Sequence, residues 1–237
     1  MIIFLDIVFL FFIGCTFGWI LELFYRRLAH GYWVNPGFLV GPYLPIYGFG
    51  LCTLTVIYIT FYEMNLPSIL IILLMGAAMT LIEFIGGLSF VNKPVKLWDY
   101  SDNWGNYKGI ICPLFSFIWT MISAVYYYFL SEFILEKILW FNNHLIFSYI
   151  LGMFTATFII DYVYSTKLLS KVRAYAKESG AVLRYEEFKR TIKEHQQSIK
   201  EKHSFIFPIK PSMDLKEYVK NYKKHLKKLK KISKKSK

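Results

Sequence analysis

Carboxylates inside apolar stretches are the side chains of this sequence best suited to chemistry. Glu83 lies well inside the apolar run 67–90, and Glu22 and Asp161 lie near the ends of two other runs. A charged carboxylate at the centre of a bilayer costs on the order of 2.5–3.5 kcal/mol, and it usually faces a partner or a water-filled cavity. It can serve an ion or a substrate, or it can pair with an arginine and only hold helices together. For Glu22 and Asp161, an ordinary interfacial charge is the simpler interpretation.

We expect these carboxylates to converge with nearby charges on the cytoplasmic half of the protein. Asp99 and Asp102 follow the same apolar run as Glu83, and two arginines follow Glu22 closely. Two loop carboxylates fall short of the six or more oxygens of a calcium site, so no metal is predicted there. The expected cytoplasm-facing polar cluster comprises Glu22, Arg26, Arg27, Glu83, Asp99, Asp102 and Asp161.

A second candidate site is the irregular stretch at the start of the second apolar run. Asn35-Pro36-Gly37 is a strong turn signal, and more prolines and glycines follow it. Irregular backbone at membrane depth is tolerated where it is buried in protein or lines a cavity. The alternative is a kinked helix start that binds no ligand. The residues of this expected pocket are Pro36, Gly37, Gly41, Pro42, Pro45 and Tyr47.

The residue types that carry out covalent or metal chemistry show no suggestive spacing. Cys15, Cys52 and Cys112 are odd in number and lack a CxxC spacing, which is typical of buried, inert thiols. We therefore expect no catalytic residues, no metal and no cofactor, in a protein that is not an enzyme. The sequence also lacks the GxxxxGK[ST] loop whose backbone N–H groups cradle nucleotide phosphates, so this chain is not itself an ATPase.

Five apolar runs must position these side chains. They are Met1–Tyr25, Tyr43–Tyr62, Pro67–Phe90, Ile110–Leu130 and about His144–Tyr164. A bilayer core is roughly 30 Å thick, and a helix needs about 20 apolar residues to cross it. With 55% hydrophobic residues, the sequence predicts an all-α polytopic transmembrane helix bundle of five spans. The first run lacks a basic leader, so we interpret it as a true span.

Charge divides the chain into two parts and orients it. Residues 1–166 carry 6 Lys or Arg against 9 Asp or Glu, whereas residues 167–237 carry 22 against 7. This division predicts a transmembrane domain, 1–166, and a basic helical cytoplasmic tail, 167–237. The positive-inside rule then places the C-terminus inside and, with five spans, the N-terminus outside. Ser131–Asn143 is expected as an outer loop of a multi-pass protein in a bacterial plasma membrane.

The tail is expected to contact lipid. Residues 167–203 are predicted as a helix broken near Gly180, and a basic amphipathic helix is predicted after Ser212. Such a helix fits anionic lipid headgroups of the inner leaflet, where each lysine is worth about 1 kcal/mol. A short coiled coil and nucleic-acid contact are the alternatives. Nucleic acid is the less favoured partner because the tail is already tethered at the bilayer.

Two further patterns concern helix packing. Gly14-x-x-x-Gly18 allows close approach of helices, and packing within the chain is favoured over dimerisation because a polytopic chain has its own helices to pack. A weak internal repeat also relates two halves, and it predicts that Glu22 and Glu83 face each other across an axis along the membrane normal. The residues in corresponding order are Glu22, Trp33, Gly37 and Tyr47, and then Glu83, Trp98, Gly109 and Trp119.

Four stretches carry a resemblance to a known family, and they are Gly18–Glu22, Gly37–Gly50, Trp98–Asp102 and Gly109–Cys112. Over about residues 9–130 the chain resembles the bacterial membrane proteins named Putative ABC-transporter type IV, and the basic tail lies outside this match. The resemblance implies a membrane location and a role in transport. Ile110 departs from the family pattern, which often carries arginine after the glycine, so no ion-pair role is carried over to it.

Three functions are consistent with these observations. The first is a permease-type transport component that uses a cytoplasm-facing cavity around Glu22 and Glu83 and recruits a separate ATP-binding subunit. The second is a non-catalytic membrane scaffold or sensor whose basic tail reads lipid charge. The third, a membrane enzyme, ranks last because no nucleophile arrangement or metal spacing supports it.

Overall fold

The computed structural model describes residues 2–31, 33–178, 183–185 and 188–190, and it is mostly helical. The order of the elements is α1 (Ile2–His30), α2 (Pro45–Tyr62), α3 (Ser68–Leu88), β1 (Val95–Lys96), α4 (Pro113–Val125), the π-helix η1 (Tyr126–Leu130), α5 (Ser131–Asn143), the 3-10 helix η2 (Leu145–Phe147), α6 (Ser148–Glu178) and β2 (Leu183–Arg184). The predicted amphipathic helix after Ser212 lies outside the described residues.

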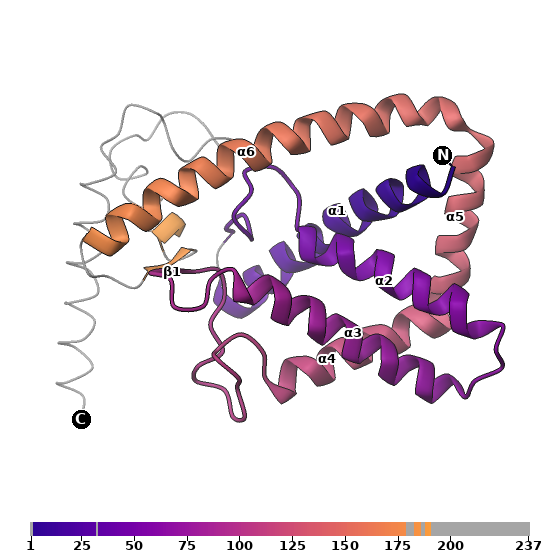
Figure 1. Ribbon diagram of the computed structural model, residues 1–237, viewed down its shortest axis with the longest axis horizontal. Coiled ribbons are helices and arrows are strands. Elements are labelled where there is room, and N and C mark those ends of the chain that lie inside the picture. Colours follow the sequence, from indigo (N-terminus) through magenta and orange to yellow (C-terminus); the bar gives the residue numbers. More distant parts are fainter. Residues whose placement is uncertain (1, 32, 179–182, 186–187, 191–237) are drawn as a thin grey trace.

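Five helical segments are long and apolar enough to cross a membrane, which confirms the predicted bundle of membrane-competent helices. Their bounds are Ile3–Leu28, Pro45–Tyr62, Ser68–Leu88, Pro113–Asn143 and Leu145–Glu178. Many of their large apolar side chains are exposed on the outside of the bundle, as expected for a surface that faces lipid. In Figure 1, α6 continues past the ends of the other helices, on the side opposite the N-terminus.

The prediction of an outer loop over Ser131–Asn143 is wrong, because this stretch forms helix α5. Its two glutamates and one lysine suggested a loop, but Ile134 and Phe141 are buried and give the helix an apolar face. The five-residue π-helix η1 joins it to α4, and π-helical turns commonly accompany a bend. Figure 1 shows the result: α5 crosses one end of the bundle and leads into α6, which returns alongside α1.

Two apolar clusters form the core of the bundle. One joins α2, α3 and α4 with residues of α1, η1 and α5, and Met75 and Ile71 of α3 are fully buried in it. The other joins α1, α5 and α6 with the connection 31–44, which inserts Leu39 and Tyr43. This connection, named loop 31–44 below, therefore belongs to the packed interior, although it has no regular secondary structure over most of its length.

The glycines of Gly14-x-x-x-Gly18 lie against α2 of the same chain. A Cβ added at Gly14 would lie 2.7 Å from the carbonyl oxygen of Tyr47 and 2.9 Å from the Cα of Gly48. A Cβ at Gly18 would overlap the side chain of Tyr47. Backbone atoms cannot give way as a flexible side chain can, so Gly14 permits the close approach of α1 and α2.

We expect Gly14→Ala to lower the free energy of unfolding by about 1–3 kcal/mol, the usual cost of overpacking. Gly152→Ala is the matched control, because nothing lies within 4 Å of a Cβ at that helical position. At that position, alanine should leave the free energy of unfolding as it is in the wild type or raise it by up to about 1 kcal/mol. Thermal unfolding of the detergent-solubilised variants measures both, and equal melting temperatures for the two variants would contradict the packing described.

Candidate functional site

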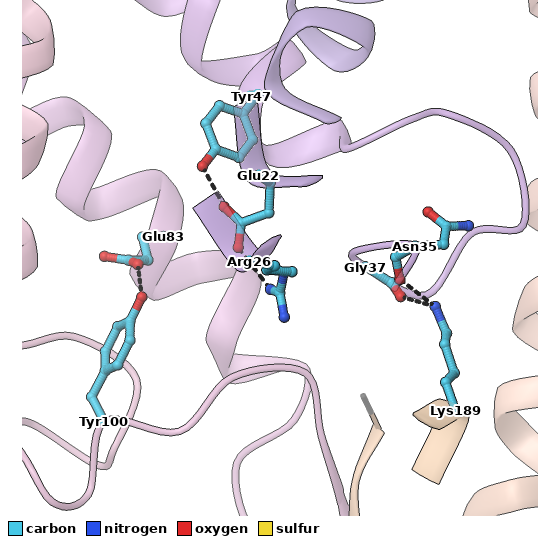
Figure 2. A network of polar contacts seen from close by, with 8 residues as sticks. All are labelled: Glu22, Arg26, Asn35, Gly37, Tyr47, Glu83, Tyr100 and Lys189. Carbon is cyan, nitrogen blue, oxygen red and sulfur yellow. Dashed lines mark hydrogen bonds and ion pairs between the residues drawn. The ribbon is translucent and has the colours of Figure 1, made fainter. Parts of the chain in front are cut away.

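Glu83 of α3 is buried inside the bundle, with only 3% of its surface exposed. The indole Nε1 of Trp119 on α4 donates a hydrogen bond to its Oε2 at 3.0 Å, and the hydroxyl of Tyr100 donates to its Oε1 at 2.8 Å. Both carboxylate oxygens thus have neutral donors, which a buried carboxylate needs to offset the loss of water. Figure 2 shows Tyr100 reaching Glu83 from the connection between α3 and α4.

Glu22 of α1 also has two partners that bind its carboxylate, and they come from α1 and α2. The hydroxyl of Tyr47, in the first turn of α2, donates to its Oε2 at 2.9 Å. The guanidinium of Arg26, one turn further along α1, forms an ion pair with its Oε1 at 2.7 Å (Figure 2). Glu22 therefore has a cation as a partner, whereas the hydrogen bonds described for Glu83 come from uncharged groups.

The two sets of partners meet through their aromatic rings. The ring of Tyr47 packs edge-on against that of Trp119, with centroids 5.7 Å apart and planes inclined at 62°. Tyr47 donates to one carboxylate and Trp119 to the other, so this ring contact links the two halves. We name Glu22, Tyr47, Glu83, Tyr100 and Trp119 the carboxylate centre.

The two parts of the chain that meet at this centre, α1–α2 and α3–α4, share several local features. In each half, one long helix carries the glutamate, and the next begins with a proline at its first turn, Pro45 in α2 and Pro113 in α4. The connections before these helices contain Gly37 and Gly109, with φ of 72° and 68°, a conformation that favours glycine. The second helix then supplies the aromatic donor.

Tyr100 is held as a hydrogen-bond donor by its surroundings. Burial and the neighbouring carboxylate of Glu83 raise the pKa of the Tyr100 hydroxyl well above its usual range. A phenol in this position keeps its proton throughout the physiological pH range, so the centre presents a fixed donor to Glu83.

Loop 31–44 is fixed by side chains rather than by regular secondary structure. The side-chain oxygen of Asn35 accepts a hydrogen bond from the Trp19 indole at 2.6 Å, and its amide donates to the carbonyls of Leu39 and Val40. From α6, the carboxylate of Asp161 accepts hydrogen bonds from the backbone N–H of Val40 at 3.1 Å and of Gly41 at 2.8 Å. Backbone groups left free at membrane depth would be costly, and these contacts satisfy them.

The chain beyond α6 returns and contacts both connections at this end of the bundle. Strand β2 pairs in parallel with β1, with Leu183 opposite Val95. Lys189 then donates hydrogen bonds from its Nζ to the carbonyl oxygens of Asn35 at 3.0 Å and Gly37 at 2.6 Å (Figure 2). The start of the basic tail is therefore part of the folded structure rather than an appendage to it.

The environment of Lys189 makes its contribution to stability depend on pH. Burial, and then the charge of Arg26, lower the pKa of Lys189 from 10.5 to about 7, while Asp161 opposes the shift. The folded chain thus loses this proton near pH 7, but the unfolded chain keeps it until about pH 10. Since the unfolded state binds more protons across this window, stability rises with pH between these values.

We expect the melting temperature of the wild type to rise relative to that of Lys189→Met between about pH 6 and pH 9, because methionine cannot titrate. Lys171→Met, at an exposed position of α6, is the matched control and should show no such divergence. Thermal unfolding in detergent at both pH values measures the effect. A constant difference between wild type and Lys189→Met would contradict the assigned environment.

The residues of the predicted polar cluster fall into several groups of contacts. Asp99 forms an ion pair with Lys96 at 2.9 Å and accepts hydrogen bonds from Ser101. Burial would raise the pKa of Asp99, but the hydrogen bonds from Ser101 and Lys96 outweigh it and lower the pKa below its usual range. Asp102 is exposed on the same connection.

Other residues of the predicted cluster and pocket lie in loop 31–44 or contact residues near it. Arg27 donates to the carbonyl of Gly31 and lies over the ring of Trp33. Asp161 binds the loop itself, and Pro36, Gly37, Gly41 and Pro42 are part of it. Of the predicted pocket residues, Tyr47 joins the carboxylate centre, and Pro45 begins the helix that carries it.

Sequence reasoning missed the donors Tyr100 and Trp119, the anchor Asn35 and the half-buried Lys189. Trp119 appeared only as a member of the internal repeat, and this repeat was the one signal that could have joined it to Glu83. Within the described part of the chain, no group of three His, Cys, Asp or Glu side chains is arranged to hold a metal ion. The centre can hold negative charge next to hydroxyl and indole donors, which suits the binding of a polar or cationic group.

The chain is similar to a known family of membrane proteins. The family named Putative ABC-transporter type IV matches residues 9–166, which extends beyond the stretch 9–130 that carries the resemblance in the sequence. The matched region contains the whole carboxylate centre, loop 31–44 and Asp161, and it ends within α6. No curated protein and no solved structure matches the chain.

Proposed function

This chain belongs to the Putative ABC-transporter type IV family, and we propose that it is the permease-type membrane component of a transport system. In this proposal it has no catalytic activity of its own, and the ATP-binding subunit is a separate chain. The observation that carries the proposal is Glu83, a carboxylate buried within a membrane-competent helix and held by donors from α4 and from the connection before it. Ionisable groups placed in this way mark substrate and ion pathways in membrane proteins.

The position of the carboxylate centre between two similar halves supports transport in particular. Transporters built from repeats bind their substrates where the repeats meet, and they work by moving one repeat against the other. Here the contact between Tyr47 and Trp119 is one place where the halves meet, and each of these side chains also donates to a glutamate. A movement of the halves would separate the two rings, while each glutamate keeps the donors from its own half.

We infer an orientation with the N-terminus outside and the C-terminus inside, in a bacterial plasma membrane. Lys93, Lys96 and Lys108 lie in the connection between α3 and α4, and the strongly basic residues 167–237 begin in the last turns of α6 and continue beyond it. In Figure 1, this connection and the end of α6 lie on the same side of the bundle, opposite the N-terminus. The positive-inside rule makes this the cytoplasmic side, where an ATP-binding subunit would dock.

A second function, a non-catalytic sensor of lipid charge, is favoured by the attachment of the tail to both connections. β2 pairs with β1, and Lys189 binds loop 31–44, so a tail drawn to anionic headgroups could change the bundle through these contacts. In that case, function would survive Glu83→Gln and fail when tail lysines are neutralised. The transport proposal predicts the reverse.

Purification from the native cell in mild detergent, followed by mass spectrometry, tests the transport proposal. We expect a stoichiometric ATP-binding subunit to accompany the tagged chain. This subunit should be lost when residues of loop 31–44 or of the connection between α3 and α4 are substituted. A chain that purifies alone, or only with partners unrelated to transport, would overturn the proposal. Labelling of single cysteines placed at Asn65 and Asn92 tests the orientation, with Asn65 expected outside and Asn92 inside.

A further inference from the structure

A cavity of about 650 Å³ opens beside the end of α3, apart from the carboxylate centre. Its lining combines the end of α3, the connection from residue 90 to residue 98, the turn at 108–110 and the last turn of α6. Four lysines from these segments line it, and they are Lys93, Lys96, Lys108 and Lys177. Separate parts of the fold thus bring basic side chains to one concave surface.

The charged side chains among the described residues that line this cavity are all lysines. Lys96 forms an ion pair with Asp99 at 2.9 Å, but no Asp or Glu is among the described residues that line the cavity. Lys93, Lys108 and Lys177 are exposed and line the same cavity, and the ammonium of Lys108 also lies 5.2 Å from the centre of the Tyr107 ring. Like charges held close together repel each other, and an anion that enters the cavity would relieve this repulsion.

The lining also includes apolar residues from the end of a membrane-competent helix. Gly87 and Phe90 come from the end of α3, and the Trp98 indole donates to the carbonyl of Ile110 at 2.9 Å. Tryptophan is enriched at the level of lipid headgroups. The cavity therefore combines lysines with aromatic surface near the end of a membrane-competent helix.

We propose that this cavity binds an anionic phosphate group between Lys93, Lys108 and Lys177. Ammonium groups are strong donors to phosphate oxygens, and basic pockets between membrane helices on the cytoplasmic side bind anionic headgroups. The phosphate could belong to a lipid or to a soluble molecule, because the chemistry of recognition is the same. This site is distinct from the predicted attachment of the tail to lipid, since three of its four lysines lie before the tail and all four lie within the folded structure.

Two binding measurements on the purified full-length chain test the proposal and distinguish the sources. Native mass spectrometry measures retention of phosphatidylglycerol against phosphatidylcholine, and isothermal titration calorimetry measures binding of inorganic phosphate. The variant is Lys93→Gln/Lys108→Gln, with Lys177→Gln as a second variant at an exposed helical position in case the first fails to fold. Lys137→Gln, whose ammonium lies over the ring of Phe133 on α5, is the matched control.

We expect at least one probe to bind the wild type. The affinity of the cavity variants for that probe should fall about fivefold for each lysine removed, while the control variant binds it as the wild type does. A loss confined to phosphatidylglycerol identifies a lipid headgroup, and a loss confined to inorganic phosphate identifies a soluble ligand. Apart from Lys177, the lysines of the tail are intact in every variant, so their attraction for lipid cancels in the comparison. Equal affinities of wild type and both cavity variants for both probes would overturn the proposal.

Discussion

Glu83→Gln is expected to lower ATP turnover by the purified complex about 10- to 150-fold, the equivalent of losing a hydrogen-bonded charge worth about 1.5–3 kcal/mol. Glutamine has nearly the shape of glutamate, so the α3–α4 packing should persist. Its amide, however, can accept from only one of the two donors that hold the carboxylate, the Trp119 indole and the Tyr100 hydroxyl. The charge at the centre is lost as well. The readout is ATP hydrolysis by the complex in lipid nanodiscs.

Two controls separate this effect from a failure to fold. Glu63→Gln removes a carboxylate from the exposed turn between α2 and α3, and it should leave ATP turnover unchanged. The amount of ATP-binding subunit that accompanies the Glu83→Gln chain should also equal that of the wild type. Wild-type turnover by Glu83→Gln would show that this carboxylate is only structural.

Asp161→Ala is expected to give the largest loss of stability among single substitutions in loop 31–44 and its anchors. The carboxylate accepts from two backbone N–H groups, those of Val40 and Gly41, and from the hydroxyl of Ser165 at 2.7 Å. Each buried donor left without an acceptor costs about 1–3 kcal/mol, so we expect the free energy of unfolding to fall by about 2–4 kcal/mol. Thermal or denaturant unfolding in detergent measures it.

Asp161→Asn should fall between the wild type and Asp161→Ala, because the amide keeps one acceptor oxygen and turns a donor toward the other N–H. Ile160→Ala is the matched control at the neighbouring position, where the side chain is 69% exposed on the outside of the bundle. If the melting temperature of Asp161→Ala equals that of the control variant, then the stability of loop 31–44 does not depend on this carboxylate.

The membrane-spanning helices could be predicted from the sequence because lipid imposes a simple length requirement on apolar runs. Helix α5 could not, since its charges at Glu132, Glu136 and Lys137 resemble those of a loop, and its apolar face becomes evident only when α1 lies beside it. The pairing of β1 with β2 could not be predicted from the sequence either. Two-residue strands have no periodicity from which they could be recognised.

The carboxylates of the candidate site were recognisable, but their partners were not. Charge within an apolar run identifies Glu83 without any knowledge of the fold. Its donors lie 17 and 36 residues away, at Tyr100 and Trp119, in a chain with 19% aromatic residues where no single one stands out. Lys189 lies 154 residues from Asn35 within the basic tail, and only folding distinguishes it from the other lysines there.

A double-mutant cycle between Glu22 and Glu83 tests most directly whether the carboxylate centre acts as one working site. ATP turnover is measured for the wild type, for Glu22→Gln, for Glu83→Gln and for the double variant. If one shared site links the two halves, the double variant should lose about as much activity as the worse single variant, because groups that act as a unit are strongly non-additive. If the loss of activity in the double variant equals the product of the two single losses to within about twofold, the result would contradict a shared centre, because independent effects add in free energy.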